Sequence, residues 1–491
     1  MTKLIIHSKD ETNAYIKGDI STVSEIAKFF EFRPDGYMFM PAYKVGAWDG
    51  IIRPINGYTG EFKKGLTNEV IKTAESLGHD IAVDEDDYAY IDESIPLVPT
   101  DNISNGKGEH IEPYDYQVAG AQYVLDNKRG IVISPTGSGK SLLQYILVKS
   151  LIEHGYKKIL IVVPTVGLVT QLYSDFNEYS EFDDDFNVDE LIHKISGGKD
   201  KDDVNKKVYI STWQSLQNVK DRSYFEQFQA VFVDEAHKAK GKSLTNILEK
   251  STNAKIKAGF TGTLEESKLH KTTLLGLFGD IYNTASIDEL MTRGILSNLQ
   301  VQSIILKHKA EVPKLEYKDE LDYLVTHPKR NKVIMNLAAM QEGNTLILFQ
   351  LVKSHGKPLY EQMKEKYPDR DIYLIYGGVK ADERERIRLE LESKDNAIII
   401  ASYQTFQEGI NIKKLHNVIF ASPSKSRIRV FQSLGRGLRT HSTKEEATLY
   451  DIADDMRSGR KAMNHTLKHF KERLEMYIQE DFKIKFTELE L

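Results

Sequence analysis

Short aliphatic runs recur along most of this 491-residue chain and are separated by amphipathic stretches of helical length. The first series of runs comprises Ile131–Ile133, Ile159–Val163, Val208–Ile210, Val231–Val233 and Ala258–Phe260. The second series comprises Thr345–Phe349, Ile372–Ile375, Ala397–Ala401 and Val418–Ala421. Continuous apolar strands that alternate with helices are typical of parallel sheets covered by helices on both faces. The pattern therefore predicts two α/β lobes in tandem.

A different pattern precedes the first series. Short strand-like runs mix with two helix-like segments, Ser21–Phe30 and Thr67–Leu77, which predicts a small α+β domain. Acidic and turn-forming residues follow, among them Asp84–Asp87, Pro96 and Asn105-Gly106, and they favour a linker. The expected parts are an accessory domain over 1–95, a linker over 96–110, a first lobe over 111–290, a second lobe over 291–455 and a helical extension over 456–491.

Composition excludes several classes of protein. The chain has no cysteine, which removes disulfides, thiolate metal sites and cysteine nucleophiles, and fits a reducing cytoplasm. No aliphatic run approaches the ~20 residues of a membrane span, and the N-terminus lacks the apolar stretch of a signal peptide. The 66 basic and 72 acidic residues give a net charge of −6. Composition alone thus lacks the basic footprint of a nucleic-acid binder.

A phosphate-binding loop follows the first aliphatic run. The segment Ser134–Ser141, SPTGSGKS, matches the pattern G-x-x-x-x-G-K-[ST] with serine in place of the first glycine. Gly137 and Gly139 allow positive φ and a close approach of backbone N–H groups to phosphate oxygens. The pattern predicts that Lys140 neutralises the β- and γ-phosphates and that Ser141 binds Mg²⁺. The nucleotide-binding residues expected in this loop are Pro135, Thr136, Gly137, Ser138, Gly139, Lys140 and Ser141.

A pair of carboxylates follows the run Val231–Val233. Asp234 and Glu235 begin the sequence DEAH at the predicted carboxyl end of a strand. Asp234 suits the binding of Mg²⁺, and Glu235 suits the orientation and deprotonation of an attacking water. For His237 two roles stay open, coupling of the metal site to the lobe interface or a local hydrogen bond. Together with the loop, these residues predict a nucleoside triphosphate hydrolase.

The order of further motifs narrows the kind of hydrolase. In chain order they are Tyr114–Gln117, Ser134–Ser141, Pro164–Gln171, Ser211–Gln214, Asp234–His237, Thr261–Thr263, Tyr376–Gly378, Ser402–Asn411 and Gln432–Arg439. This series, over about 110–455, resembles that of superfamily 2 helicases and translocases. The resemblance implies two RecA-like parallel-sheet lobes, ATP as the nucleotide with Mg²⁺, and a nucleic acid as the partner.

The resemblance also assigns roles to single residues. Gln117 would read the adenine beside Tyr114, and Gly409 and Gln432 would also belong to the ATP site. Arg436 and Arg439 lie three residues apart and would act on the γ-phosphate as catalytic residues. The residues that would couple nucleotide state to lobe movement are His237, Thr261 and Thr263. Those that would contact nucleic acid are Pro164, Thr165, Gln171, Thr212, Gln214, Gly377 and Thr405.

The N-terminal region narrows the resemblance further. Phe30–Phe39, Lys44–Gly50 and Arg53, together with Tyr450–Asp455, are similar to the UvsW-type phage recombination helicases. That family implies an ATP-dependent DNA helicase that regresses forks, migrates Holliday junctions and dissociates R-loops and D-loops in phage recombination, repair and replication. It implies single-stranded, double-stranded and branched DNA as partners, in the host bacterial cytoplasm and without a membrane. RNA in R-loops and single-strand-binding or recombination proteins are further candidate partners.

Several alternatives stay open. The same motifs occur in double-strand DNA translocases that do not separate strands and in RNA helicases. A non-catalytic scaffold is disfavoured by Glu235, Arg436 and Arg439. Basic residues near Trp48, namely Lys44, Arg53, Lys63 and Lys64, form either a duplex-facing patch or a solvated surface around a core tryptophan. The basic stretch Arg457–Arg473 is either a helix near DNA or a solvated surface.

Overall fold

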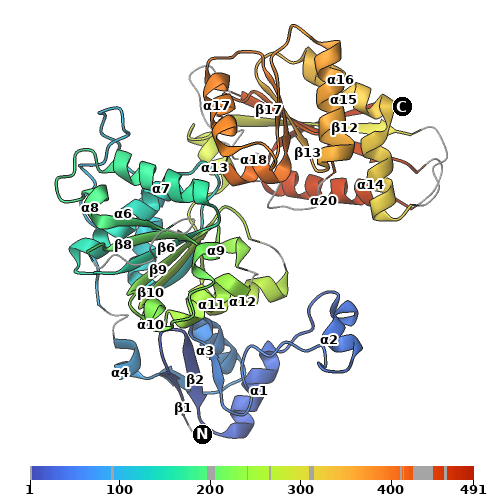
Figure 1. The fold of residues 1–491 in the computed structure, drawn as a ribbon. Helices are drawn as coiled ribbons and strands as arrows, with labels where there is room; N and C mark the ends of the chain where they lie inside the picture. Colours follow the sequence, from blue (N-terminus) through green and yellow to red (C-terminus); the bar gives the residue numbers. More distant parts are fainter. Residues whose placement is uncertain are drawn as a thin grey trace. The chain divides into compact units, whose positions relative to one another are not determined.

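The computed structural model describes ten stretches of the chain, namely 3–89, 93–195, 205–239, 242–264, 267–308, 315–409, 412, 414–423, 446–457 and 462–491. The chain divides into two compact units. The first unit comprises residues 1–134 and 139–284, and the second comprises residues 285–491 with the short segment 135–138. The first unit contains the accessory domain as well as the first lobe (Figure 1).

The accessory domain is built on a mixed four-stranded sheet. Its strands, in spatial order, are β3 (Glu61–Lys63), β2 (Asn13–Lys17), β1 (Leu4–Ser8) and β4 (Ile81–Val83). Its helical segments are α1 (Ile20–Phe30), η1 (Tyr37–Phe39), α2 (Pro41–Lys44), η2 (Lys64–Leu66), α3 (Thr67–Ser76) and α4 (Glu85–Tyr88). Asp19 caps α1 by accepting from the Ser21 backbone N–H at 3.1 Å. The left-handed Gly78, with φ 82°, follows the C-terminal end of α3. Both predicted helices are confirmed.

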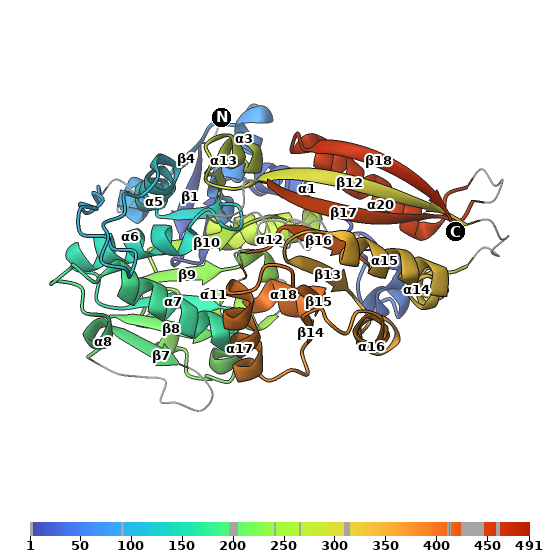
Figure 2. The same cartoon turned by 90° about the horizontal axis from the view of Figure 1, so that it is seen from above.

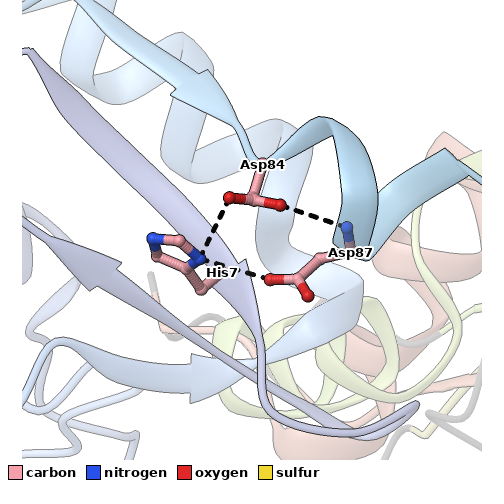
Figure 3. Close-up of side chains that lie close together, drawn as sticks. All are labelled: His7, Asp84 and Asp87. Carbon is pink, nitrogen blue, oxygen red and sulfur yellow. Dashed lines mark hydrogen bonds and ion pairs between the residues drawn. The ribbon is translucent and has the colours of Figure 1, made fainter.

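The acidic stretch Asp84–Asp87 folds onto the accessory domain instead of starting a linker. Nδ1 of His7 lies 3.3 Å from a carboxylate oxygen of Asp84 and 3.3 Å from one of Asp87 (Figure 3). Asp87 also accepts from the Ser8 backbone N–H at 3.0 Å, and Asp84 caps the short helix α4 at 3.1 Å. These contacts fasten α4 to β1. The carboxylates of Asp84 and Asp87 accept local hydrogen bonds, so this acidic run is not a solvated loop.

The segment expected as a linker, 96–110, lies against the first lobe. Ile95, Val98 and Ile103 are buried, and Ile95 and Ile103 belong to the core on one face of the first-lobe sheet. The Val98 backbone N–H donates to Ser150 Oγ at 3.2 Å. The apolar side chains in this segment are few and irregularly spaced, so they give no periodic signal in the sequence although Val98 and Ile103 are buried.

The first lobe contains a seven-stranded sheet in which all paired strands are parallel. Its strands, in spatial order, are β11 (Ile281–Asn283), β5 (Arg129–Ile133), β10 (Ile256–Thr261), β9 (Ala230–Asp234), β6 (Ile159–Val163), β8 (Val208–Thr212) and β7 (Ile192–Ile195). Alternate residues enter two separate cores, for example Phe232 on one face and Val231 and Val233 on the other. All five predicted strands of the first series are confirmed.

Helices cover both faces of this sheet. They are α5 (Asp115–Asn127), α6 (Lys140–Glu153), α7 (Val166–Tyr179), α8 (Val188–Leu191), α9 (Trp213–Leu216), α10 (Ser223–Glu226), η4 (Ala236–Lys238), α11 (Lys242–Lys250) and α12 (Lys268–Phe278). Ten consecutive positions of α6, from Leu142 to Leu151, are buried. The helix that follows the phosphate loop is therefore held on all sides by the lobe.

The second lobe repeats the architecture. Its parallel strands, in spatial order, are β14 (Ile372–Ile375), β15 (Ile398–Ser402), β13 (Thr345–Phe349), β16 (Asn417–Phe420), β17 (Glu446–Asp455), β12 (Asn298–Lys307) and β18 (Lys483–Glu490). Its helical segments are α13 (Ile287–Thr292), α14 (Tyr317–Thr326), α15 (Pro328–Met340), η5 (Val352–Gly356), α16 (Lys357–Lys366), α17 (Ala381–Glu392), α18 (Tyr403–Gly409) and α20 (His465–Gln479). The prediction of two RecA-like lobes after a small α+β domain is confirmed.

The C-terminal segment differs from the helical extension expected over 456–491. It contains helix α20, but β18 then pairs in parallel with β12 along eight residue pairs and becomes the edge of the sheet. Figure 2 shows β18, β12 and β17 side by side. Most side chains of β18 are exposed, so the strand lacks the apolar run by which the sequence analysis recognised buried strands. Among the described residues, no helix is long and apolar enough to cross a bilayer.

Candidate active site

The nucleotide-binding motifs meet at one edge of the first-lobe sheet. Strands β5, β10 and β9 are neighbours, and each is followed at its carboxyl end by a motif. Ile133 of β5 lies beside Thr261 of β10, and Phe260 lies beside Asp234 of β9. Ligands of parallel α/β sheets bind at this edge. The topology therefore brings the phosphate loop, the DEAH segment and Thr261 together.

The phosphate loop has the backbone that its glycines predict. Gly137 and Gly139 adopt φ values of 92° and 81°, and Gly139 directly precedes the first residue of α6. The N-terminus of α6 presents backbone N–H groups and a partial positive charge to an anion. Lys140 Nζ donates to the Ser134 carbonyl at 3.0 Å, so the ammonium group lies over the loop. This is the cradle that a triphosphate requires.

Gln117 lies against the phosphate loop. Its Nε2 donates to the Gly139 carbonyl at 3.4 Å, and a Cβ added at Gly139 would lie 2.2 Å from that nitrogen. Its Oε1 accepts from the Tyr114 backbone N–H at 2.8 Å, which caps α5. The rings of Tyr114 and Tyr116 stack with centroids 5.5 Å apart, and Tyr114 is exposed. Gln117 thus joins the loop to the aromatic pair proposed to flank the adenine.

The two carboxylates of the DEAH segment have opposite electrostatic settings. Burial and the adjacent Glu235 raise the pKa of Asp234 to about 7. Burial also acts to raise the pKa of Glu235, but the hydrogen bond with His237 and the charge of Lys140 outweigh it and lower that pKa to about 2. Two half-buried carboxylates this close cannot both ionise easily without a cation. The donor set fits a divalent cation such as Mg²⁺, with Ser141 and Asp234 as the residues that would hold it.

A hydrogen-bonded chain leads from Glu235 to the next strand. Nδ1 of His237 lies 3.2 Å from Glu235 Oε2 and 2.9 Å from Thr261 Oγ1, and His237 is buried. Thr261 Oγ1 in turn donates to the Thr263 carbonyl at 2.8 Å. Glu235 has φ 53°, a left-handed conformation that a glutamate adopts only at a cost of about 1–3 kcal/mol. The backbone is therefore strained at the residue expected to position water.

Two residues at this site were missed by the sequence analysis. Gln144 Nε2 lies 3.5 Å from Asp234 Oδ1, and Tyr179 OH lies 3.0 Å from Ser141 Oγ. Gln144 stands four residues after Lys140 on α6, so helical spacing could have placed it on the same face. Nothing in the sequence near Tyr179 indicates its contact, because it comes from the far end of α7.

The residues expected to contact nucleic acid in the first lobe occupy the same carboxyl edge. Val163 of β6 lies beside Thr212 of β8, so Pro164, Thr165 and Thr212 follow neighbouring strands. Thr165 caps α7 and Thr212 caps α9 through their side-chain oxygens. Gln171 and Gln214 are exposed. The glutamines are the freer of these side chains to meet a ligand, whereas both threonines are used as caps.

In the second lobe, the described part of the site is smaller. Gly377 follows β14 and is exposed, and Thr405 lies in α18 after the neighbouring strand β15. Thr405 is buried, and its Oγ1 accepts from Ser402 Oγ at 2.8 Å. Gly409 ends α18. Gln432, Arg436 and Arg439 lie outside the described residues.

Comparison with known proteins decides the family. Three family models match, namely the type III restriction enzyme res subunit over 110–266, the N-terminal domain of the DNA helicase UvsW over 3–84 and the helicase conserved C-terminal domain over 328–441. The ATP-dependent DNA helicase UvsW of Enterobacteria phage T4 is 33% identical over 501 residues, covering 97% of each chain. The chain belongs to the UvsW family of DNA helicases. It is a helicase driven by ATP hydrolysis, and it binds nucleic acid.

Solved structures agree with this family. The crystal structure of T4 UvsW matches with a TM-score of 0.52 and 32% identity, covering 99% of both chains. The DNA-bound type ISP restriction-modification enzyme LlaBIII matches with a TM-score of 0.56, but at 15% identity and over 36% of its length. The second likeness shows a shared fold alone. The family implies ATP, typically with Mg²⁺, and the half-buried carboxylates of Asp234 and Glu235 fit that cation.

Most of the basic residues near Trp48 in the UvsW-type domain form ion pairs within the protein. Lys64 is buried and pairs with Glu11 at 3.0 Å, and Lys63 pairs with Glu249 at 2.7 Å. Arg53 pairs with Glu31 at 3.2 Å. Trp48 is half-buried and its Nε1 donates to the Ile51 carbonyl at 2.9 Å. Three of the four basic residues are therefore engaged within the protein.

Two arginines of the basic stretch Arg457–Arg473 also form ion pairs within the protein. Arg457 Nη2 lies 2.6 Å from Asp455, and the buried Arg473 binds Asp451 through two nitrogens at 2.8 Å each. Arg473 is thus a structural residue of the second lobe. The interpretation of the whole stretch as a DNA-facing helix does not hold for this residue.

Proposed function

We propose that this UvsW-family helicase remodels branched DNA in the host bacterial cytoplasm. The proposed reactions are fork regression, Holliday junction branch migration and dissociation of R-loops and D-loops during phage recombination, repair and replication. The proposed partners are branched, single-stranded and double-stranded DNA, RNA in R-loops, and single-strand-binding or recombination proteins. Lys140, Asp234, Glu235, Arg436 and Arg439 are the proposed catalytic residues.

The observation that carries this proposal is the meeting of the phosphate loop and the carboxylate pair at one sheet edge. Bound ATP with Mg²⁺ would supply the electrophilic γ-phosphorus. Lys140 extends from the N-terminus of α6, where it can neutralise phosphate charge. The low pKa of Glu235 keeps this carboxylate ionised, so it can accept a hydrogen bond from water and orient it. The His237–Thr261 contact is placed to transmit the state of this site along β10.

The junction of the accessory domain with the first lobe supports action on branches. Arg129 and Lys257 are paired neighbours at the opposite ends of β5 and β10 from the ATP motifs. Both donate to the accessory domain, Arg129 to the Glu11 carbonyl and Lys257 to Thr12 Oγ1 at 2.7 Å. The strands that carry the ATP motifs thus also hold the accessory domain. A step of the first lobe would move this domain with it.

The test is a substrate panel for ATP hydrolysis and unwinding, with single-stranded, duplex, forked, four-way and R-loop substrates. Lys140→Ala and Glu235→Gln should each lower DNA-stimulated hydrolysis by roughly 100-fold or more, as the loss of preorganised charge at a transition state does. Lys157→Ala, an exposed lysine in the same lobe, is the matched control and should hydrolyse ATP like the wild type. Retained hydrolysis in both site variants would reject the assignment of the site.

The same panel separates the competing functions. A double-strand translocase without strand separation has one supporting observation, the match of 110–266 to the restriction-enzyme res subunit. It would show duplex-stimulated hydrolysis without product strands on forks or junctions. An RNA helicase would prefer RNA duplexes over every DNA substrate. Product strands from forks, four-way junctions and R-loops, in excess over blunt duplex, support the branched-DNA function.

A further inference from the structure

A closed arm, residues 33–51, leaves the accessory domain between two paired residues. Phe32 and Ile52 form an antiparallel bridge, with the Phe32 N–H donating to the Ile52 carbonyl at 3.2 Å and the reverse bond at 2.8 Å. Figure 1 shows the arm carrying α2 on a loop that leaves the body of the domain beyond α1. The bridge fixes both ends of the arm, so its tip is presented from a defined base.

The arm is ordered by its own contacts. The rings of Tyr37 and Tyr43 meet edge to face with centroids 4.9 Å apart. The Ala47 N–H donates to the Ala42 carbonyl at 2.9 Å, and Trp48 Nε1 donates to the Ile51 carbonyl. The two tyrosine rings also lie against Gly50, where an added Cβ would come within 2.5 Å of Tyr37 and 3.2 Å of Tyr43. The arm is therefore a shaped element and not an extended loop.

The outer surface of this arm is apolar and open to solvent. Phe39 is 74% exposed and Val45 is 77% exposed, and Met38 and Met40 beside them are also exposed. Exposed apolar surface gathered in one place marks an interaction site.

Positive charge borders the apolar surface. Lys44 Nζ lies 6.0 Å from the centre of the Phe39 ring, and the Arg33 guanidinium lies 5.3 Å from that of Tyr37. Both cations are exposed. Of the two acidic residues on the arm, Asp49 is bound by Arg53, which leaves Asp35 exposed. An exposed aromatic ring beside cations matches a nucleotide, because the ring can stack on a base while the cations meet phosphate.

We propose that this arm binds the branch point of DNA, with Phe39 stacked on the base pair that the branch exposes. Val45 and Met38 would cover the same base pair, and Lys44 and Arg33 would contact the flanking phosphates. Apolar side chains on other DNA-binding proteins insert at base steps in this manner. Stacking tolerates any base, which suits a motor that acts at any sequence. The inference deepens the proposed function and rests on it.

The base of the arm connects this contact to the motor. Lys268 of α12 in the first lobe places its Nζ 4.9 Å from the centre of the Phe32 ring, at the bridge that closes the arm. Arm and first lobe belong to the same compact unit. The stacked base pair would therefore be held by the unit that contains Lys140 and the DEAH segment.

The experiment uses the full-length protein and forked DNA with 2-aminopurine at the branch-point base pair. Wild-type protein should change the 2-aminopurine fluorescence on binding, and Phe39→Ala should abolish this change and slow fork unwinding about tenfold, because one base stack is worth about 1–3 kcal/mol. Phe39→Trp should restore both. The control is Tyr58→Ala, which removes an aromatic side chain of the same domain that is 79% exposed but lies off the arm.

The outcomes separate the arm from the motor. Hydrolysis of ATP on single-stranded DNA should stay within about twofold of wild type in all three variants, since none touches the ATP site. Loss of fork unwinding with intact hydrolysis supports the arm, whereas a wild-type protein that never unwinds forks rejects the proposed function itself. Equal unwinding by wild type and Phe39→Ala, equal damage from Tyr58→Ala, or a concentration-dependent dimer that Phe39→Ala dissolves would each overturn the proposal.

Discussion

The second lobe and the junction of the accessory domain with the first lobe bury charge in opposite ways. In the second lobe, buried charges are matched in pairs, and the two nitrogens of Arg473 that bind Asp451 do so at 2.8 Å while Tyr477 OH donates to the same carboxylate at 2.9 Å. Arg330 and Asp454 form a second buried pair at 2.9 Å. Each cation there has a carboxylate in direct contact.

Cations gather without such matching between the accessory domain and the first lobe. Lys64 and Arg129 both approach Glu11, at 3.0 Å and 3.6 Å, while Lys257 is held by neutral oxygens of Thr12 and Leu248 at 2.7 Å and 3.2 Å. Burial, followed by the charge of Arg129, lowers the pKa of Lys257 well below its ordinary value. Burial likewise lowers the pKa of Lys64.

The difference indicates which polar contacts each unit depends on for its stability. The Arg473–Asp451 pair, hydrogen-bonded through two nitrogens, fixes one arrangement, and the loss of one partner leaves a bare charge in the core. Arg330 bonds Asp454 through Nε alone. An interface that buries excess positive charge gains less from its polar contacts, since desolvation of the lysines opposes them. We therefore expect the second lobe to depend on its ion pairs more strongly than the accessory domain depends on its interface.

Removal of one carboxylate in the second lobe should have the largest effect. Asp451→Asn leaves the buried Arg473 guanidinium without its counter-charge, which should lower the free energy of unfolding of this unit by about 3–5 kcal/mol. Urea denaturation of the two variants Asp451→Asn and Asp451→Leu/Arg473→Met would measure it. The double variant should regain most of the loss, and an unchanged midpoint in the single variant would contradict the matched-pair account.

Removal of the interface carboxylate should have a smaller effect. Glu11→Gln takes the counter-charge from Lys64 and Arg129 but keeps the backbone carbonyl that Arg129 also uses, so we expect a loss of about 2 kcal/mol. Hydrogen exchange of β1 and β2 would report it, because these strands should open more often while the second lobe stays protected. Glu61→Gln, on an exposed carboxylate paired with Lys9, is the matched control.

Removal of an interface lysine should test whether its buried charge stabilises or destabilises the first unit. Lys257→Met deletes a buried charge whose acceptors are neutral, so unfolding should change by less than about 1 kcal/mol, or the unit should become more stable. Differential scanning calorimetry resolves this against Glu11→Gln. A loss as large as that of Asp451→Asn would show that the interface is as tightly matched as the second lobe.

The smallest expected effect is the pH dependence, which has the same direction in the two units but falls in a different pH range for each. The folded pKa values of Lys64 and Lys257 lie below their ordinary 10.5, so the first unit should gain stability as pH rises from 7 toward that value. Burial acts to raise the pKa of Asp454, but the charge of Arg330 and the hydrogen bond with His308 outweigh it and lower that pKa below 3.8. The second unit should therefore lose stability as pH falls below 3.8. Melting of each unit across pH would check both slopes, and a flat alkaline profile in the first unit would remove the argument for Lys257.

Much of both lobes could be predicted because their signals are local. The strands Ile159–Val163 and Thr345–Phe349 are buried on both faces and therefore read as unbroken apolar runs. The phosphate loop is recognisable because its backbone requires positive φ at Gly137 and Gly139, a conformation that favours glycine. By contrast, β18 is an exposed edge strand, and the acidic segment Asp84–Asp87 binds His7 across the sheet, so neither has a signal in its own stretch of chain.

The residues of the chain by themselves determined the two parallel sheets and the motifs at their carboxyl ends, because apolar periodicity and loop chemistry act over a few positions. Only the tertiary structure decided which cations pair with carboxylates of the protein itself. Lys63, Lys64, Arg53 and Arg473 read alike as surface cations, yet each meets a carboxylate. Phe39 stands exposed on the arm, which no pattern in the sequence indicates. Burial and pairing depend on contacts between distant segments, which no local pattern records.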